Sequence, residues 1–313
     1  MTTPLAILCP GQGAQALGMG RAWAEASPEA RAVFDEADAV LEGSLGSPLS
    51  TLCFEGPEEA LNRTDACQPA LFTAGVASWR GLRASLGFAA GEAPVAAAAG
   101  LSLGEYTALH IAGAMDFATG LKLVALRGKA MQDAAAATPS GMVALIGVDE
   151  EQANAIADAS RNDGVLVCAN FNAPGQVVLS GDAAACERAV AEAKAAKVRA
   201  TPLQVAGAFH SPIMQPASER LGEALAAAEI ATPSAPVWSN VTAAPHEPDA
   251  GAIKARLAEQ LTSPVRWAAC VAAMHQMLPD AAFHELAPGK TLAGMARRID
   301  KSLTITSHDA PVL

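Results

Sequence analysis

The sequence has few aromatic residues and no excess of basic ones. Aromatic side chains make up only 4% of the 313 residues, whereas 51% are hydrophobic and 17% are charged. This composition argues against disorder and requires a core built largely from small aliphatic side chains. The net charge is −11. Because nucleic-acid binding needs a basic surface, we do not expect nucleic acid as a partner.

Cysteine pairs and long apolar runs are also missing. The six cysteines are scattered and form no CxxC pair, so we expect no disulfide framework and no zinc or other metal site. No stretch is long and apolar enough to cross a bilayer. The N-terminal run MTTPLAILCPGQGAQ has no basic region and stops at Pro10 and Gly11, so we expect no signal peptide. These absences predict a cytoplasmic protein without a membrane partner.

Strands and helices alternate over the first part of the chain. Residues 4–9 and 94–100 are predicted to be short buried strands, because each is apolar and bounded by Gly or Pro. Helices are expected over 19–42, 65–87, 105–115 and 117–137. This alternation indicates an α/β layer architecture with a parallel sheet.

The pattern changes between residues 138 and 207. Strands are predicted at 142–148, 165–171, 176–181 and 198–205, and helices at 149–160 and 182–197. The order β-α-β-β-α-β is that of a ferredoxin-like unit. We therefore predict a large α/β domain made of residues 1–137 and 208–313, with a ferredoxin-like subdomain, residues 138–207, inserted in it.

One short motif is able to present a nucleophile. In AAGLSLGEYTALHIAGA, Ser102 lies two residues after Gly100 and two before Gly104, which gives a GxSxG pattern. In such an elbow the serine occupies a sharp turn between a strand and a helix, and the glycines remove side chains that would clash. The predicted strand and helix agree with this. A serine that merely caps a helix is an equal alternative at this point.

A serine hydroxyl attacks well only when a base removes its proton. Of the six histidines, His210 in AGAFHSPIM ranks first, because it follows a predicted strand among small residues, where a loop could reach Ser102. Spacing alone does not pair the two residues.

Nine stretches, which include those around Ser102 and His210, carry a family resemblance. They are, in chain order, PGQGAQALGMG, TDACQPAL, GLSLGEYTAL, LRGKAMQ, NFNAPGQVVLSG, GAFHSPIM, SNVTA, QLTSPVRW and ELAPGK. In this order and at these spacings the chain resembles the malonyl-CoA:acyl carrier protein transacylases of fatty-acid synthesis and the related acyltransferase domains of polyketide synthases. The resemblance covers almost the whole chain. It implies an α/β-hydrolase-like large domain with an inserted ferredoxin-like subdomain.

The resemblance also implies a ping-pong mechanism. Ser102 would take malonyl from the coenzyme A thioester, and His210 would act first as base and then as acid. The backbone N–H groups of Gln12 and Leu103 would form the oxyanion hole, and the main-chain carbonyl of Gln260 would hold the second imidazole nitrogen. Malonyl-CoA would be a substrate, so no cofactor is implied. The acyl carrier protein would be the partner, and we expect a monomer.

Substrate selectivity is assigned, by the same resemblance, mainly to Arg127. Its guanidinium would bind the free carboxylate of malonyl in a bidentate pair; from the sequence alone, an ion pair with a helix neighbour competes with this interpretation. Phe209 would favour malonyl by crowding a substituent on the α-carbon. Met131 and Gln68 would line the same pocket, with Asn172 as a further candidate. Plain core packing is the alternative for Phe209 and Met131.

Two positions depart from the family pattern. Leu101 stands where most relatives have a histidine directly before the nucleophile, and Ala287 stands where a glycine is usual. Because that histidine is not the general base, the chemistry should survive its replacement.

Basic residues near the C-terminus suggest a docking face. Lys290, Arg297, Arg298 and Lys301 have spacings that would place them on one face of a helix, and carrier proteins are acidic. A solvated face whose cations favour a helix C-terminus is the competing interpretation.

Three other functions remain open from the sequence. The chain could be a discrete acyltransferase that serves a polyketide synthase, a serine hydrolase of malonyl thioesters, or a catalytically inactive acyl-binding scaffold. The polyketide acyltransferase would catalyse the same acyl transfer as the transacylase. The hydrolase would transfer the acyl group to water, and the scaffold would catalyse no reaction.

Overall fold

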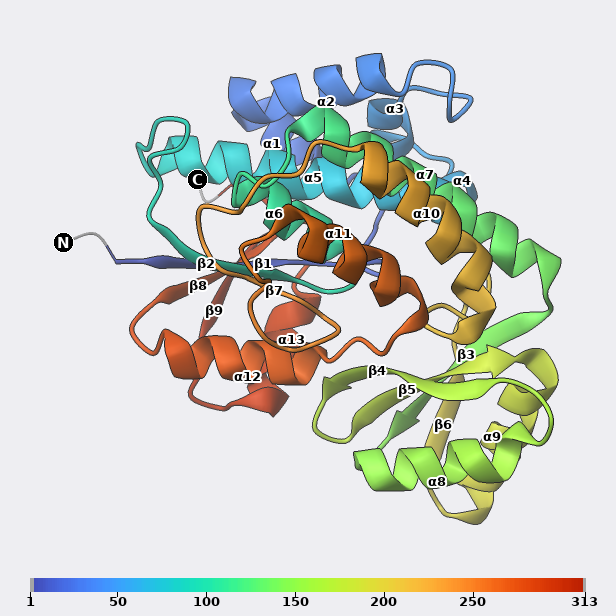
Figure 1. The fold of residues 1–313 in the computed structure, drawn as a ribbon. Helices are drawn as coiled ribbons and strands as arrows, with labels where there is room; N and C mark the ends of the chain where they lie inside the picture. The colour runs from blue at the N-terminus through green and yellow to red at the C-terminus, as the bar shows by residue number, and fades with distance from the viewer. Residues whose placement is uncertain (1–2, 312–313) are drawn as a thin grey trace.

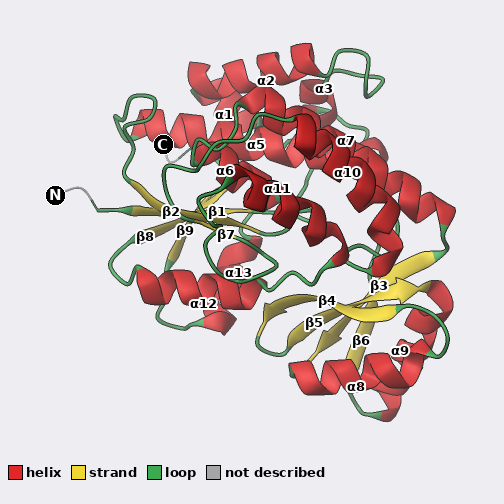
Figure 2. Cartoon of the chain, viewed as in Figure 1, coloured by secondary structure: helices red, strands yellow, loops and turns green. Residues whose placement is uncertain are grey.

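A computed structural model, which describes residues 3–311, contains two separate β-sheets (Figures 1 and 2). The larger sheet has the strand order β7-β2-β1-β8-β9, and all of its pairings are parallel. Its strands are β1 (Leu5–Cys9), β2 (Val95–Gly100), β7 (Val237–Trp238), β8 (Ala282–Leu286) and β9 (Ile305–His308). β1 and β2 are neighbours, so the loops that follow them meet at one edge of the sheet.

Helices cover both faces of this parallel sheet (Figure 1). Successive side chains of a strand point to opposite faces, and in β1 Ile7 joins one apolar cluster while Leu8 joins the other. The first cluster includes residues of α1 (Arg21–Ala26), α2 (Pro28–Val40), α3 (Leu49–Phe54), α4 (Glu58–Leu61), α5 (Thr64–Ser85), α6 (Gly104–Ile111), α7 (Phe117–Ala137), α10 (Gln215–Ala227) and α11 (Ala250–Glu259). The second includes residues of α12 (Trp267–Met277) and α13 (Thr291–Ile299).

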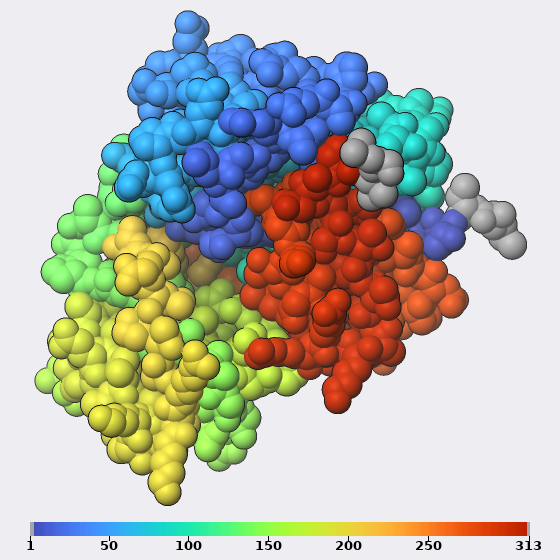
Figure 3. All heavy atoms as spheres, turned by 180° about the vertical axis from the view of Figure 1, so that it is seen from behind, coloured from blue at the N-terminus to red at the C-terminus, as the bar shows by residue number. Residues whose placement is uncertain are grey.

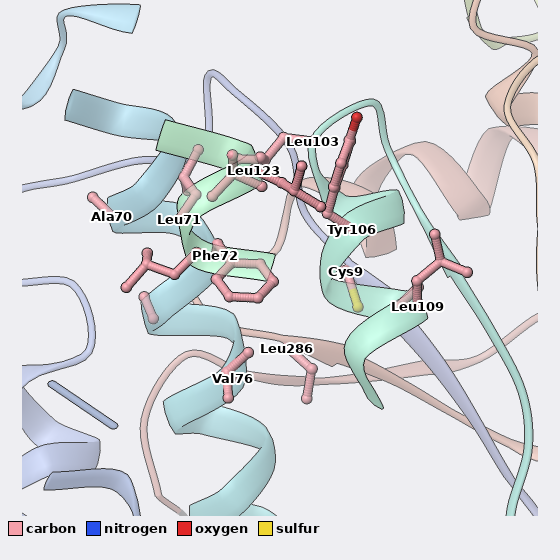
Figure 4. Packing of buried hydrophobic residues seen from close by; sticks show 14 of the residues in the cluster. Cys9, Ala70, Leu71, Phe72, Val76, Leu103, Tyr106, Leu109, Leu123 and Leu286 are labelled. Carbon is pink, nitrogen blue, oxygen red and sulfur yellow. The ribbon is translucent and has the colours of Figure 1, made fainter. Parts of the chain in front are cut away.

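The packing of α6 fixes the segment that follows β2. Figure 4 shows Tyr106 and Leu109 of α6 among Phe72 of α5, Leu123 of α7 and Leu286 of β8. These side chains are 0–4% exposed. Burying a side chain of this size stabilises the fold by roughly 2 kcal/mol, so α6 and the turn before it are held firmly against the sheet.

The second sheet is antiparallel, with the strand order β4-β5-β3-β6. Its strands are β3 (Ser140–Ile146), β4 (Leu166–Ala173), β5 (Gln176–Asp182) and β6 (Arg199–Pro202). α8 (Glu150–Arg161) and α9 (Ala183–Ala195) pack against it and form a third apolar cluster. The predicted fold class is confirmed: a parallel α/β sheet with a separate sheet in β-α-β-β-α-β order. The domain boundaries at residues 138 and 207 stay a prediction.

Three predicted elements differ from the structure. The helix expected over 19–42 is two helices, because Ser27 is extended and its side chain caps α2 with Pro28 in the first turn. The helix expected to reach residue 115 ends at Ile111, since Gly113 takes a positive φ of 76°. The strand expected over 198–205 ends at Pro202.

Two glycines bring the segments after β1 and β2 into direct contact, and a third, Gly100, lets the elbow itself close tightly. A Cβ atom on Gly11 would lie 2.1 Å from the Leu101 carbonyl oxygen, and one on Gly104 would lie 2.1 Å from the Cys9 carbonyl oxygen. A Cβ atom on Gly100 would lie 1.8 Å from the carbonyl carbon of Gly104. The backbones therefore touch where no side chain fits. No helix within residues 3–311 is long and apolar enough to span a bilayer.

Candidate active site

Ser102 lies on the turn between β2 and α6, as the GxSxG motif predicts. Its φ of 52° is in the left-handed region, which is unusual for a residue other than glycine. Its backbone N–H donates to Oδ1 of Asn240 at 2.6 Å, and Nδ2 of Asn240 donates to the Gly100 carbonyl at 2.8 Å. Asn240 thus ties the strained turn to the strand that precedes it.

His210 meets Ser102 from the loop between β6 and α10. Its Nε2 lies 2.8 Å from Ser102 Oγ, and its Nδ1 lies 2.8 Å from the main-chain oxygen of Gln260. A carbonyl oxygen only accepts, so Nδ1 carries the proton and Nε2 is free to accept the serine proton. The structure therefore brings Ser102, His210 and Gln260 into the relation that the resemblance implies.

The burial of His210 keeps it neutral. The side chain is 4% exposed. Burial, with the nearby charge of Arg127, lowers the pKa of His210 from 6.5 to about 4. An imidazole that is unprotonated at neutral pH can act as a general base there.

Arg127 of α7 points its guanidinium at the same serine. Nη2 donates to Ser102 Oγ at 3.0 Å and to Gln260 Oε1 at 3.0 Å, and Nη1 donates to Gln68 Oε1 at 2.7 Å. All of these partners are neutral. Because Arg127 is only 1% exposed, a cation is held here by polar groups that carry no charge.

The ion pair that competed as an explanation of Arg127 is absent. Within residues 3–311, no ion pair to Arg127 is found. Nε of Arg127 is buried without a hydrogen-bond partner there. Burial lowers the pKa of the guanidinium, and arginine nevertheless stays charged in proteins. A buried cation with neutral partners favours an anionic ligand.

Two backbone N–H groups beside the serine elbow have no hydrogen-bond partner among the described residues. Leu103 follows the serine directly, and Gln12 lies in the loop after β1, which contacts the elbow through Gly11. No hydrogen bond among the described residues uses the N–H of either residue. Both groups are thus available to donate to a developing charge near Ser102.

A pocket of about 660 Å³ opens in front of the serine. Its lining includes Ser102, His210, Phe209, Met131 and Asn172. Figure 3 shows N-terminal, middle and C-terminal segments of the chain meeting around a hollow on this face. The pocket is of the size that small-molecule sites have.

Gln68 is not among the residues that line this pocket, and neither is Arg127. Both side chains are buried, and Oε1 of Gln68 accepts from Nη1 of Arg127 at 2.7 Å. The amide nitrogen of Gln68 lies 3.3 Å from the sulfur of Met131 and 3.4 Å from Oε1 of Gln12, and both of those residues line the pocket. Gln68 therefore holds Arg127 and contacts the lining, and its part in substrate binding stays a prediction.

Leu101 gives the pocket an apolar side chain at the position where most relatives have a polar histidine. It lines the pocket together with Leu292 and Met295 of α13 and packs against the apolar cluster on that side of the sheet. Oδ1 of Asn172, by contrast, is buried without a partner among the described residues.

Sequence reasoning missed two buried polar residues behind the dyad. Glu105 and Asn240 are both 0% exposed and connect to the serine turn and to Gln260. An acidic residue in an apolar helix, as in GEYTALHI, was an available signal for Glu105. Asn240 lies in SNVTA, one of the stretches that carry the family resemblance, but the sequence assigned it no role.

The four basic residues near the C-terminus do not form one helical face. α13 spans Thr291–Ile299, so Lys290 precedes it and Lys301 follows it. Arg297 and Lys301 border a small surface groove, whereas Thr291 and Met295 border the pocket of Ser102. The helical spacing of the four residues predicted one face, but the helix ends at Ile299, before Lys301.

A parallel α/β sheet that presents a serine–histidine pair on a glycine elbow, with a buried arginine at the serine, defines a serine acyl-transfer enzyme. The chain belongs to the family described as the acyl transferase domain, whose model matches residues 7–307.

Full-length relatives agree with this assignment. The chain is similar to the "malonyl CoA-acyl carrier protein transacylase" of Salmonella typhimurium, with 40% identity over 310 residues, 99% of this chain and 97% of that protein. The malonyl-CoA:acyl carrier protein transacylase structure from Xanthomonas oryzae matches with a TM-score of 0.91 and 42% identity, covering 99% and 96% of the two chains. A malonyl-transacylase in complex with its type II PKS acyl-carrier protein matches with a TM-score of 0.90 and 38% identity, covering 99% and 97%.

Proposed function

We propose that this protein is a malonyl-CoA:acyl carrier protein S-malonyltransferase of fatty-acid synthesis. The family, the full-length similarity to transacylases and the buried Ser102–His210–Arg127 group support this function. The single observation that carries the choice of malonyl is Arg127, a buried guanidinium whose hydrogen-bond partners are all neutral.

The first half of the reaction makes an ester on Ser102. His210 Nε2 takes the serine proton as Oγ attacks the thioester carbonyl, and the backbone N–H groups of Gln12 and Leu103 receive the oxyanion. When the tetrahedral intermediate collapses, the C–S bond breaks and His210 protonates the departing coenzyme A thiolate. The main-chain oxygen of Gln260 keeps the proton on Nδ1 throughout.

The second half returns the acyl group to a thiol. His210 removes the proton from the phosphopantetheine thiol of the carrier protein, and the thiolate attacks the malonyl-serine ester. The C–O bond breaks, and His210 gives the proton back to Ser102 Oγ. The products are the malonyl thioester of the carrier protein and the free enzyme, and no cofactor takes part.

Selectivity follows from the charge of Arg127. A malonyl carboxylate satisfies the buried guanidinium in a charge-assisted pair, whereas an acetyl group leaves it without an anion. A polar site rejects an analogue that lacks its partner group much more strongly than an apolar pocket rejects a missing methylene. Phe209 and Met131 line the pocket and limit the space beside the α-carbon.

Among the alternatives, a role with a polyketide synthase is not favoured over fatty-acid synthesis. A hydrolase would have the same dyad but water as acceptor, and an inactive scaffold would have no use for a serine 2.8 Å from a neutral histidine. Location in the cytoplasm and action as a monomer form part of this proposal.

The deciding experiment is intact-protein mass spectrometry after brief mixing with malonyl-CoA or acetyl-CoA. Wild type should gain one malonyl increment, Ser102→Ala should gain none, and acetyl-CoA should label poorly. Addition of carrier protein should then remove the increment. Release of coenzyme A without an adduct would indicate a hydrolase, and no adduct and no release would indicate a scaffold.

A further inference from the structure

A buried carboxylate lies directly behind the catalytic pair. Glu105, in the first turn of α6, is 0% exposed, and its two oxygens meet donors from separate parts of the chain. Oε2 accepts from the backbone N–H of Asn240 at 2.9 Å and from Nε2 of Gln260 at 2.7 Å. Oε1 lies 2.7 Å from Nε2 of His246. A buried charge with so complete a set of partners is costly to assemble, so its arrangement calls for an explanation.

One arm of this arrangement reaches the nucleophile. Glu105 fixes the backbone of Asn240, and the side chain of Asn240 accepts from the N–H of Ser102 and donates to the carbonyl of Gly100. Both the oxygen and the nitrogen of the Asn240 side-chain amide therefore have a hydrogen-bond partner in the serine turn. The left-handed conformation of Ser102 costs energy, and this arm holds it in place.

The other arm reaches the arginine. A carboxylate can only accept, so Gln260 must turn its amide nitrogen toward Glu105 and its amide oxygen away. That oxygen accepts from Nη2 of Arg127 at 3.0 Å. If the amide were reversed, its NH₂ group would face the guanidinium, and two donors would oppose each other. The same nitrogen also donates to the main-chain oxygen of Ser102 at 3.1 Å. Glu105, at the shorter distance of 2.7 Å, and this carbonyl together set which end of Gln260 the arginine meets.

We propose that Glu105 is a positioning residue that aligns Ser102 through Asn240 and Arg127 through Gln260, and so couples acyl transfer to selection of a substrate carboxylate. This inference rests on the proposed function. It goes beyond it because Glu105 contacts neither Ser102 Oγ nor His210, and acts only on the residues that orient them. His246 meets the carboxylate oxygen that neither arm uses.

The test compares acylation by malonyl-CoA and acetyl-CoA in folded variants. Glu105→Ala removes both arms, and we expect kcat/KM for malonyl-CoA to fall at least 100-fold and the malonyl-to-acetyl ratio to fall about 10-fold. Glu105→Gln can keep an acceptor oxygen toward Asn240 and Gln260, so it should restore the ratio to within about threefold of wild type.

Glu285 provides a matched control. It is also 0% exposed, but it accepts from the backbone N–H groups of Leu292 and Ala293 at the start of α13 and from Oγ of Ser307. Glu285→Ala, matched to Glu105→Ala, should lower the melting temperature and leave the malonyl-to-acetyl ratio unchanged. A purely structural role of Glu105 would give this same result.

An unchanged ratio in folded Glu105→Ala overturns the proposal, whatever happens to the rate. If Glu105→Ala does not fold, Gln260→Met takes its place, since it removes the amide and keeps the main-chain oxygen that His210 meets. A lowered ratio in that variant supports the proposal, and a wild-type ratio overturns it. Failure of the proposed function is seen separately, as a wild-type protein that forms no malonyl adduct.

Discussion

Nη2 of Arg127 lies 3.0 Å from Oγ of Ser102, so the residue that selects the substrate also touches the nucleophile. The same oxygen lies 2.8 Å from Nε2 of His210. The serine hydroxyl thus accepts from a cation and donates to a neutral base. This arrangement stabilises negative charge on Oγ as its proton leaves. The contribution of Arg127 to selectivity and that of His210 to proton transfer can therefore be measured in separate experiments.

Replacement of Arg127 by alanine should abolish preference for a carboxylate. We expect kcat/KM for malonyl-CoA to fall by about 10²–10³-fold, since a buried charged pair is lost, and kcat/KM for acetyl-CoA to fall much less. Single-turnover acylation followed by mass spectrometry measures both. Arg31→Ala, which removes an exposed i,i+4 ion pair on α2, is the control and should change neither. Equal losses for the two substrates would contradict the assigned role.

The pH profile of acylation should show an acid limb near the lowered pKa of His210. The histidine acts as a base only when neutral, so kcat/KM should be level around neutral pH and fall as the pH approaches about 4. Arg127→Ala removes a positive neighbour and should move this limb to higher pH. The measurement uses acetyl-CoA for the variant, with recovery at pH 7 to show that the protein stayed folded. A wild-type limb at 6.5 would be incompatible with the buried site.

Acid should also destabilise the fold through a second histidine. Nε2 of His308 lies 2.8 Å from Nδ1 of His284, and burial, followed by the effect of His284, lowers the pKa of His308 to about 4. Between pH 6.5 and 4 the unfolded chain binds a proton that the folded chain does not, so the free energy of unfolding falls as the pH falls. Urea titrations should show this slope, and His308→Gln should flatten it in part. His210, His110 and His284, whose pKa values are also lowered by burial, contribute to what remains. Identical slopes for both proteins would exclude the pair as a cause.

Gly104→Ala should destabilise the protein severely. The added Cβ would lie 2.1 Å from the backbone oxygen of Cys9, and neither β1 nor α6 can retreat from its packed position. We expect a loss on the order of 3 kcal/mol in the free energy of unfolding. Gly141→Ala, at a position with open space around the Cβ, is the matched control. Chemical denaturation measures the free energy of unfolding of both variants. Similar losses in the two would show that the close approach of Gly104 to Cys9 is unimportant for stability.

Leu101→His should leave malonyl transfer within about an order of magnitude of wild type. The Leu101 side chain lines the pocket and is only partly buried against the apolar cluster that includes α13. It forms no hydrogen bond with Ser102 or His210, so the substitution removes none from the dyad. Steady-state transfer to the carrier protein, together with the rate of malonate release to water, tests this. Complete loss of transfer would mean that the surrounding apolar wall does not tolerate a polar ring.

The sequence predicted those features that depend on local pattern. Glycine spacing raised Ser102 as a candidate nucleophile on an elbow, and the family resemblance decided against a helix cap. The antiparallel sheet follows from the β-α-β-β-α-β order of the predicted elements. The pairing of His210 with Ser102 came from family resemblance, because 108 residues separate them and no periodicity spans such a distance. Glu105 and Asn240 went unrecognised, because their significance lies in contacts between α6 and segments more than 130 residues further on. The hydrogen bond between Gln68 and Arg127 went unrecognised for a similar reason, since it joins α5 to α7.

The close backbone approaches at Gly11, Gly100 and Gly104 have a practical consequence for anyone who wishes to change what this enzyme transfers. A side chain at any of these positions would collide with backbone atoms, even at Gly11, which lines the pocket. A mutant library aimed at new acyl donors should hold all three as glycine and place its diversity at Phe209, Met131 and Leu101, where variation reshapes the pocket without disturbing the machinery beside it.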